Sequence, residues 1–476
     1  MRRCLDKYVG NRAFYKMALA VALPIMIQTG ITNFVSMLDN IMVGSVGTEE
    51  MTGVAIANQL IFVFNLVLFG AVSGAGIFGA QFHGNSDHEG VRYAFRFKIL
   101  ICAVITAFGV VIFFGWGDKL IRLYLQGEGT PEQIEASFGF AKRYLRIMMI
   151  GFVPFMLSQC YSGTLRETGH TVLPMVAGVI SVAVNLFFNT LLIFGKLGFP
   201  RLGSAGAAVA TVIARFTEAG IVIIWTHCNR KKNPFVAGAY RSLRIPRKLV
   251  GGISKKTIPL MINETMWAGG MALLTQCYSW RGYDVVSACN IASTISNVFN
   301  VAFLSMGSAI GIIVGQQLGA GKMKEAVDTD RKLIVFAVGI CFVIGGALIL
   351  VASIFPRLYE TTPEIRNLAA SFIIVCGACM PINSLANACY FTIRSGGKTL
   401  VTFLFDGVYV CLLTVPVAFV LTRYTSLPIV PLYLCCQLLD VGKCIVGLIM
   451  IKKGVWVNNI VGKETQDENH GILPQA

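Results

Sequence analysis

Twelve long apolar runs occupy most of this chain and restrict it to one class of fold. A helix needs about 20 apolar residues to cross the roughly 30 Å hydrocarbon core of a bilayer. The runs lie at about 17–43, 52–80, 94–116, 138–161, 172–195, 203–227, 257–280, 285–318, 333–355, 366–393, 400–422 and 427–451. Only 13% of the residues are charged, against about 25% in a soluble domain. The sequence therefore predicts an all-α integral membrane protein with twelve transmembrane helices.

The two halves of the chain repeat each other. The matching segments are Leu23–Met26 with Ile258–Met261, Gly79–Gln81 with Gly315–Gln317, and Arg166–Thr171 with Arg394–Thr399. Many secondary transporters are built from two such repeats, with the substrate site between them. We therefore predict two pseudo-symmetric six-helix bundles, residues 1–227 and 257–451, around a central cleft.

The net charge of +16 follows the expected topology and does not indicate binding to nucleic acid. Segment 228–256 has no acidic residue and nine basic ones: Arg230, Lys231, Lys232, Arg241, Arg244, Arg247, Lys248, Lys255 and Lys256. Because Lys and Arg near helix ends mark the cytoplasmic side, we predict a basic cytoplasmic linker that contacts anionic membrane lipids. Basic residues near both chain ends, and at Arg92, Arg96 and Lys98 in the expected 2–3 loop, agree. Both termini and the tail 452–476 are thus expected in the cytoplasm, and the chain is expected to be a multi-pass protein of the cell membrane.

The sequence contains no pattern that predicts catalysis or a cofactor. Its five His residues are scattered, and no Ser-His-Asp arrangement or metal-ligand spacing is present. Gly397-Lys398-Thr399 resembles the end of a phosphate-binding loop, but that loop requires glycine where Thr392 stands. The matching Gly169-His170-Thr171 indicates a turn shared by the two repeats. We therefore expect neither an enzyme nor a protein with a cofactor or structural metal, so that any pumping must use an ion gradient.

Carboxylates inside the predicted helices are the main candidates for function. One at the bilayer centre costs about 2.5–3.5 kcal/mol on insertion scales, so each one requires a reason. The predicted spans contain five: Asp39, Glu218, Glu264, Asp406 and Asp440. Two of these have a structural explanation, because Glu218 is three residues from Arg215 and Asp440 three from Lys443. That spacing lets opposite charges meet on one helix face.

Asp39, Glu264 and Asp406 have no basic residue within a helical turn. In low-dielectric surroundings such a carboxyl group takes up a proton or binds a cation. The alternatives are a packing role for each and, for Asp39, a side chain that reaches the membrane interface.

The direction of each helix gives the depth of these residues. Helices one and five run outward and helix six runs inward, so Asp39, Asn185, Asn189 and Thr211 are expected to converge toward the outer side of the first half. Glu264 and Asp406 begin helices that rise from the cytoplasm, so they are expected in the inner part of the second half. We therefore predict one polar cluster in each half, at different depths.

The segments that carry these residues resemble multidrug and toxic compound extrusion (MATE) transporters. Asn185–Gly195 and Gly203–Thr211 are similar to the helix five–six signature of that family, and Val35–Gly44 is similar to its first-helix aspartate segment. The resemblance extends over nearly the whole chain. It implies two six-helix bundles that form a V-shaped cleft, and export of small amphipathic organic cations in exchange for H⁺ or Na⁺.

The resemblance also implies roles for particular residues. It places Asp39, Asn185, Asn189 and Thr211 in the ion- or proton-coupling network of the first bundle. Some members carry an ion-binding carboxylate on helix seven, so Glu264, with Asp406, is a candidate ion or substrate site of the second half. Sodium-coupled members are expected to have an aspartate on helix ten as well. Residues 365–393 contain none, which favours protons.

A different interpretation is a flippase for lipid-linked oligosaccharides from the same broad superfamily. Such a protein needs a cationic cavity for anionic phosphate groups, whereas intramembrane Arg and Lys are few here and mostly paired in sequence. A passive channel would not require two related halves with unpaired acids. Cation export by a monomeric chain is therefore the preferred hypothesis.

Overall fold

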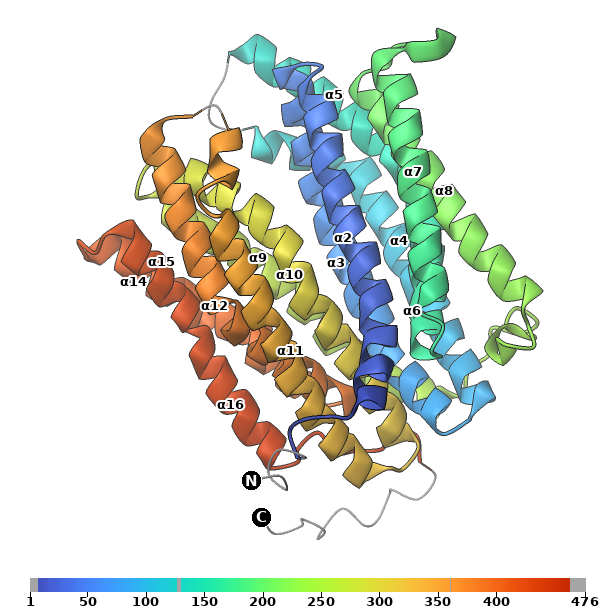
Figure 1. Ribbon diagram of the computed structural model, residues 1–476. Coiled ribbons are helices and arrows are strands. Elements are labelled where there is room, and N and C mark those ends of the chain that lie inside the picture. The colour runs from blue at the N-terminus through green and yellow to red at the C-terminus, as the bar shows by residue number, and fades with distance from the viewer. Residues whose placement is uncertain (1–6, 126–129, 360, 463–476) are drawn as a thin grey trace. The chain divides into compact units, whose positions relative to one another are not determined.

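The computed structural model describes residues 7–125, 130–359 and 361–462, apart from the side chains of residues 37, 40 and 41, and every regular element in them is helical (Figure 1). The first half forms α2 (Arg12–Gly44), α3 (Thr48–Gly84), α4 (His88–Tyr124), α5 (Pro131–Ile150), α6 (Phe152–Glu167), α7 (Val172–Phe194) and α8 (Ser204–Cys228). The second half forms α9 (Arg247–Ser279), α10 (Tyr283–Gly319), α11 (Met323–Val351), α12 (Pro363–Ser395), α13 (Thr399–Phe403), α14 (Val415–Tyr424), α15 (Ile429–Leu438) and α16 (Asp440–Lys452). Two π-helical segments, η4 (Leu404–Val408) and η5 (Val410–Thr414), join α13 to α14.

These helices account for the twelve predicted spans. Ten of the described helices or helix runs are long and apolar enough to cross a membrane, among them α13–α14 and α15–α16 as one span each. α5 and α6 meet at a 48° bend and make an eleventh span. The 33-residue α9 covers the remaining predicted span, 257–280, although it is not among the helices that are long and apolar enough by the same measure. The predicted all-α membrane fold is confirmed.

The sequence repeat is visible in the helix boundaries. α2 and α9 both contain 33 residues, and α3 and α10 both contain 37. In each pair the second helix begins 235 residues after the first. α5 and α12 both begin with proline after a threonine N-cap, Thr130 or Thr362, whose hydroxyl accepts from the backbone N–H three residues on. The same capping chemistry therefore starts the fourth span of each half.

The turn after the fourth span is also shared. Gly169 after α6 and Gly397 after α12 have φ angles of +86° and +75°, a left-handed conformation that glycine adopts without steric cost. The backbone N–H of His170 donates to the carbonyl of Leu165 at 2.7 Å and closes the end of α6. Gly397-Lys398-Thr399 is therefore a helix-terminating turn, as its repeat partner indicates.

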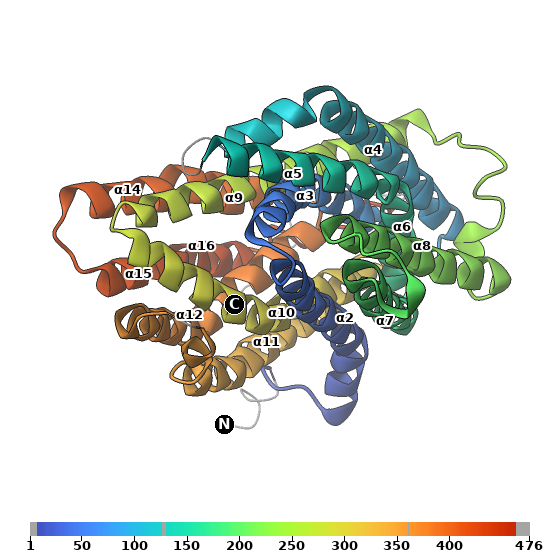
Figure 2. The same cartoon turned by 90° about the horizontal axis from the view of Figure 1, so that it is seen from above.

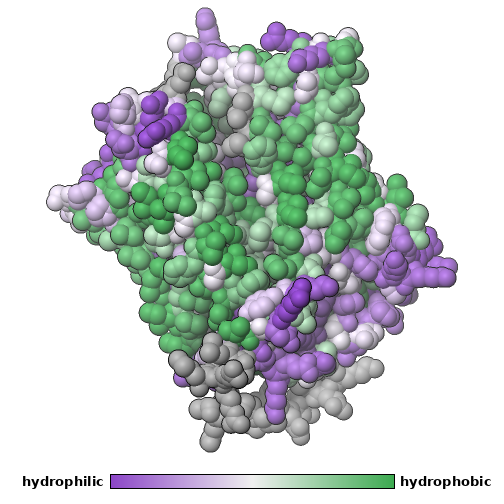
Figure 3. Space-filling view, in the orientation of Figure 1, coloured by the Kyte–Doolittle hydropathy of each residue, from purple (hydrophilic) through white to green (hydrophobic). Residues whose placement is uncertain are grey.

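Corresponding helices of the two halves also have similar exposure. In the apolar windows of α3 and α10, 61% and 56% of the residues are buried, against 28% in both α4 and α11. Phe114 on α4 is 80% exposed and Leu350 on α11 is 78% exposed. Figure 3 shows apolar side chains along the helices of its visible face and polar side chains near the helix ends. The exposed faces of α4 and α11 are therefore suited to contact with lipid.

The described chain divides into two compact units. The first unit contains residues 27–76 and 91–251, and the second contains the described parts of 1–26, 77–90 and 252–476. α2 and α3 therefore each contribute to both units. In the first unit α8 lies side by side with α7 and also packs against α5 and α6 (Figures 1 and 2). In the second unit α12 packs against α10, α11 and α16.

The last turns of α3 cross α10 within the second unit at a repeated Gln-x-x-Gly motif. A side chain added at Gly84 would overlap the backbone carbonyl of Gln316, and one added at Gly319 would overlap the carbonyl of Gln81. Gln81 and Gly84 lie 235 residues before Gln316 and Gly319, so the repeat relates the two contacts. Small residues allow helix backbones to approach this closely in a membrane protein.

Gln81 also holds the segment that follows α16. Its Nε2 donates to the carbonyls of Ser395 at 2.9 Å and Asn458 at 3.2 Å, and its Oε1 accepts from the backbone N–H of Ile460 at 2.9 Å. Gln81 is fully buried, and Trp456 in the same segment is 1% exposed. The start of the predicted tail is thus packed against the second unit, whereas residues 463–476 lie outside the described residues.

The three basic residues assigned to the expected 2–3 loop, Arg92, Arg96 and Lys98, lie in α4, so that assignment was wrong. Arg96 is buried and donates to three backbone carbonyls of the linker at 2.8–3.1 Å. Lys98 is fully buried and forms an ion pair with Glu167. Helix α9 begins at Arg247, so the last ten residues of the predicted linker are helical. Arg96 anchors the remaining part of the linker to α4.

Candidate functional site

Four residues selected in the first half come together in the first unit. Asp39 lies on α2, Asn185 and Asn189 on α7, and Thr211 on α8. The Asn189 Nδ2 donates to Asp39 Oδ1 at 2.6 Å and to Asn185 Oδ1 at 3.1 Å. The Asn185 Nδ2 donates to Thr211 Oγ1 at 3.2 Å. One chain of hydrogen bonds therefore links the three helices at these four side chains.

Small residues allow this chain of contacts to form. Asn185 and Asn189 are four residues apart, so both side chains lie on one face of α7. The facing part of α8 is rich in buried alanines, including Ala207 and Ala208, which permit close helix packing. The Thr211 hydroxyl donates to the Ala207 carbonyl at 3.0 Å. Its oxygen remains able to accept from Asn185.

Asp39 is surrounded by neutral polar groups. Asn189 is fully buried and Asn185 is 6% exposed. The reversed orientation of the Asn185 amide replaces the two hydrogen bonds that it makes to Asn189 and Thr211. Its nitrogen then lies 3.1 and 3.2 Å from the two Asp39 oxygens, and its oxygen accepts from Thr211 Oγ1 at 3.2 Å. The ion pairs found within 4 Å among the described residues do not involve Asp39. Its negative charge is thus uncompensated within that distance unless a proton or a cation binds.

Glu264 and Asp406 are connected through two residues that the sequence analysis did not select. The Tyr390 hydroxyl donates to Glu264 Oε1 at 3.4 Å. The Asn263 Nδ2 donates to Tyr390 Oη and to Asp406 Oδ2, both at 3.3 Å. The Asn263 Oδ1 accepts from the backbone N–H of Gly407 at 2.8 Å. Asn263 directly precedes Glu264, which is the one signal in the sequence that could have drawn attention to it.

The expectation that Asp406 lacks a basic partner was wrong. The Lys443 Nζ lies 3.0 Å from Asp406 Oδ1 and 3.4 Å from Asp440 Oδ1. Helical spacing identified only the contact with Asp440, because the closer contact to Asp406 joins two different helices. Glu264 interacts electrostatically with Arg394 and Asp406. The polar cluster of the second half therefore contains its own cations.

Glu218 also has a partner from another helix. Its electrostatic interactions are with Arg166 on α6 and Arg215 on its own helix. The Arg166 Nη2 donates to Gln28 Oε1 at 2.6 Å, and the Arg215 Nη1 donates to the Gly151 carbonyl at 3.4 Å. Glu218 is thus one member of a charged group that includes more than the i, i+3 pair.

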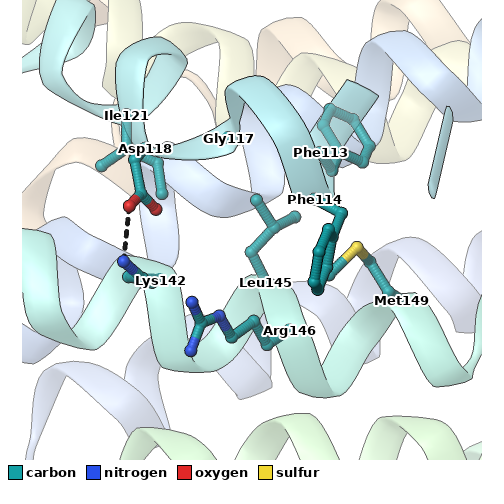
Figure 4. Close-up of a pocket in the computed structure, with 9 residues that line it drawn as sticks. All are labelled: Phe113, Phe114, Gly117, Asp118, Ile121, Lys142, Leu145, Arg146 and Met149. Atoms are coloured by element: carbon teal, nitrogen blue, oxygen red, sulfur yellow. Dashed lines mark hydrogen bonds and ion pairs between the residues drawn. The ribbon is translucent and has the colours of Figure 1, made fainter. Parts of the chain in front are cut away.

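A separate hollow lies between α4 and α5 (Figure 4). Phe114, Leu145 and Met149 form its apolar part, and Lys142 forms an ion pair of 2.5 Å with Asp118 at its edge. None of the residues selected from the sequence lines it. Within the described part of the chain, no group of three or more His, Cys, Asp or Glu side chains is placed to hold a metal ion. The two polar clusters therefore remain the candidate sites.

A duplicated helical membrane fold with a polar cluster in each half is typical of secondary transporters. A family model described as MatE matches residues 24–191 and 259–420. The chain belongs to the MatE family, as its signature segments predict. It shares 25% identity over 414 residues with "Probable multidrug resistance protein NorM" of Thermotoga maritima, covering 87% of this chain and 86% of the relative. It also shares 25% identity over 394 residues with "Probable multidrug resistance protein YoeA" of Bacillus subtilis, covering 80% and 81%.

Solved structures share the fold. One, described as the outward-facing conformation of a multidrug resistance MATE family transporter of the MOP superfamily, matches with a TM-score of 0.81 over 95% of this chain and 97% of its own. Another, described as MATE in the straight conformation, matches with a TM-score of 0.83 over 95% and 98%. Sequence identity is 18% in both cases. These structures show the shared fold. The family model and the multidrug resistance relatives make the chain a membrane transport protein and not an enzyme.

Proposed function

We propose that this chain is a multidrug exporter that moves small amphipathic organic cations out of the cell in exchange for H⁺ or Na⁺. Residues 1–227 and 257–451 form its two bundles. The linker 228–256 and the tail 452–476 lie on the cytoplasmic side of the cell membrane, together with both termini. The names of the relatives from Thermotoga maritima and Bacillus subtilis support the drug-resistance role.

The observation that carries the coupling part of the proposal is the Asp39 cluster. A carboxylate that is hydrogen-bonded to Asn189 but has no basic residue within 4 Å among the described side chains has a strong electrostatic preference for a proton or a monovalent cation. Binding neutralises Asp39 and weakens the attraction to the amide N–H groups. The contacts among α2, α7 and α8 then change with the ion, which is what a coupled transporter requires.

The amides of Asn185 and Asn189 suit either ion. With nitrogen toward Asp39, an amide stabilises the empty, anionic carboxylate. With oxygen toward the same place, it offers a ligand to Na⁺, because hard cations take oxygen ligands. Thr211 adds a hydroxyl oxygen at 3.2 Å from Asn185. The cluster can therefore exchange an ion by rotating side chains, without losing all its hydrogen bonds.

The cargo follows from the uncompensated carboxylate of the first half. Asp39 attracts positively charged compounds, and the 17 Met and 32 Phe residues of the chain offer adaptable apolar contacts. An anionic lipid-linked sugar would require the opposite charge. Organic cations with an apolar body are therefore the proposed substrates.

The test is transport of a fluorescent organic cation by the purified protein in proteoliposomes under an imposed pH or sodium gradient. Exchange of one monovalent organic cation for one H⁺ or Na⁺ moves no net charge, so the imposed concentration gradient drives it. Each tenfold gradient, worth about 1.4 kcal/mol, supports at most about tenfold accumulation of the cargo. We expect wild-type transport to depend on one gradient and Asp39→Asn to lose that coupling. Asp118→Asn is the matched control, because Asp118 is 53% exposed at an ion pair near the end of α4. It should transport like the wild type.

Three results would contradict the proposal. The first is wild-type movement of the cation that ignores both gradients. The second is full coupling in Asp39→Asn. The third is translocation of an anionic lipid-linked sugar with no transport of cations, which would establish the flippase interpretation instead.

A further inference from the structure

The ammonium group of Lys443 lies between two carboxylates in the second unit. Its Nζ is 3.0 Å from Asp406 and 3.4 Å from Asp440, and the side chain is 8% exposed. The two carboxylate side chains are 23% and 29% exposed. The ring of Tyr409 lies 5.4 Å from the same nitrogen, within the range of a cation–π interaction. The position therefore has several features that stabilise a single positive charge.

Two irregularities of the backbone build this position. Asp406 lies in the π-helical segment η4, and η5 follows it directly; π-helical turns are rare and occur mostly at functional sites. On the neighbouring span the Tyr409 hydroxyl donates to the Leu439 carbonyl at 2.7 Å, between α15 and α16. A side chain inserted at a helix break in this way is a recognised cause of distortion. Asp440 begins α16 directly after that break.

The other charged groups around the position leave no second cation close to Asp406. Asn263 donates to Asp406 Oδ2 at 3.3 Å, whereas Lys443 contacts the other carboxylate oxygen, Oδ1. Glu264 contributes a further negative charge that acts on Asp406, while Arg394 acts on Glu264. Among the described ion pairs, Lys443 is the one cation within 4 Å of Asp406 or Asp440.

We propose that Lys443 is the resident cation of the second half: its ammonium occupies the place between Asp406 and Asp440 that a free monovalent cation such as Na⁺ would take. The ammonium carries the same charge as Na⁺ and is tethered, so its effective concentration at the carboxylates is high. A free ion could enter only by leaving Lys443 buried without its partners, which is strongly unfavourable. The position between Asp406 and Asp440 in the wild-type protein therefore binds no alkali ion.

This inference deepens the proposed function and rests on it for one consequence. If transport is ion-coupled, Lys443 excludes an exchangeable ion from the position between Asp406 and Asp440, so that coupling does not use that position. The binding claim itself concerns equilibrium occupancy and does not depend on transport.

The experiment measures thermal unfolding of the full-length protein in detergent, in NaCl and in choline chloride at equal ionic strength and pH. Every variant also carries Asp39→Asn, so that the first-half cluster does not contribute. We expect no sodium-specific shift of Tm with Lys443 present. Lys443→Met should give a rise that increases with the logarithm of the Na⁺ concentration and reaches about 2 °C at ten times its dissociation constant for Na⁺. Adding Asp406→Asn to Lys443→Met should abolish that rise.

Lys332→Met is the matched control, because it removes another lysine of the second unit from an ion pair, 2.6 Å from Asp328. It should show no response to Na⁺. The inference is overturned by a sodium-specific shift with Lys443 present that Asp406→Asn removes, or by a folded Lys443→Met that does not respond. If Lys443→Met does not fold, Lys443→Gln replaces it with the same expectations. If neither folds, the protein with Lys443 present decides the inference: the absence of a sodium-specific shift in Tm supports it, and a shift that Asp406→Asn removes overturns it. Loss of coupling in transport assays of Asp39→Asn tests the proposed function separately.

Discussion

Lys98 and Glu167 form a buried ion pair and should contribute to the free energy of unfolding as a unit, so that removing both costs less than the sum of removing each. The Lys98 Nζ lies 2.5 and 2.7 Å from the two carboxylate oxygens and donates to Thr164 Oγ1 at 3.0 Å. The side chains are 0% and 9% exposed. Removing one member of a buried pair leaves an uncompensated charge and costs about 3–5 kcal/mol, whereas replacing both by apolar groups is often close to neutral.

The expected changes in the free energy of unfolding follow from this difference between removing one member and removing both. We expect Lys98→Met and Glu167→Leu each to reduce the free energy of unfolding by roughly 3–5 kcal/mol. The double variant should be more stable than either single variant, with a coupling energy of about 3 kcal/mol or more between the two sites. The assay is equilibrium unfolding in mixed detergent micelles for the wild type, both single variants and the double variant.

The matched control is the exposed pair between Arg122 and Glu135, whose atoms lie 3.3 Å apart with side chains 53% and 64% exposed. Arg122→Met should cost at most about 1 kcal/mol, because solvent screens such a pair. The reasoning is refuted if the effects of Lys98→Met and Glu167→Leu simply add, or if Lys98→Met is as mild as Arg122→Met.

Two further predictions concern the crossing of α3 and α10. Gly319→Ala should lower Tm by several degrees, because the added methyl group overlaps the Gln81 carbonyl. The control is Gly339→Ala, which lies in a helical position with open space around it and should be neutral or stabilising by up to about 1 kcal/mol. Equal Tm values for the two variants would contradict the close packing. Gln81→Leu removes three hydrogen bonds to Ser395, Asn458 and Ile460. The segment after α16 should then be cleaved faster in limited proteolysis, as measured by mass spectrometry of the fragments. An unchanged cleavage rate would show that Gln81 does not hold that segment.

Residues on one helix could be located from the sequence to a useful precision. Asp39, Asn185, Asn189 and Thr211 lie on three helices, and their depth follows from the direction of each span and the rise of about 1.5 Å per residue. Asn185 and Thr211 lie on helices that are adjacent in sequence and joined by a short loop, so similar depth implied their proximity. Asp39 and Asn189 are 150 residues apart, and the expectation that they converge rested on their common depth alone.

The partners of the second-half residues were harder to predict. Spacing along one helix assigned Lys443 to Asp440, although its closer contact is Asp406 on another helix. The sequence analysis placed Lys98 in a loop because a charge inside an apolar span is normally unfavourable. The buried charge of Lys98 is tolerated because it pairs with Glu167, 69 residues away. The roles of Tyr390 and Asn263 depend on the same kind of contact between distant segments.

The sequence alone determined that this is a twelve-helix membrane protein with two related halves, because lipid requires long apolar helices whose backbone hydrogen bonds are satisfied internally and because the repeat preserves their lengths and caps. Tertiary structure alone decided which buried charges are paired. That choice depends on how each helix is rotated about its axis, and rotation is set by packing between spans far apart in the chain. It leaves Asp39 among neutral amides and places Lys443 between Asp406 and Asp440.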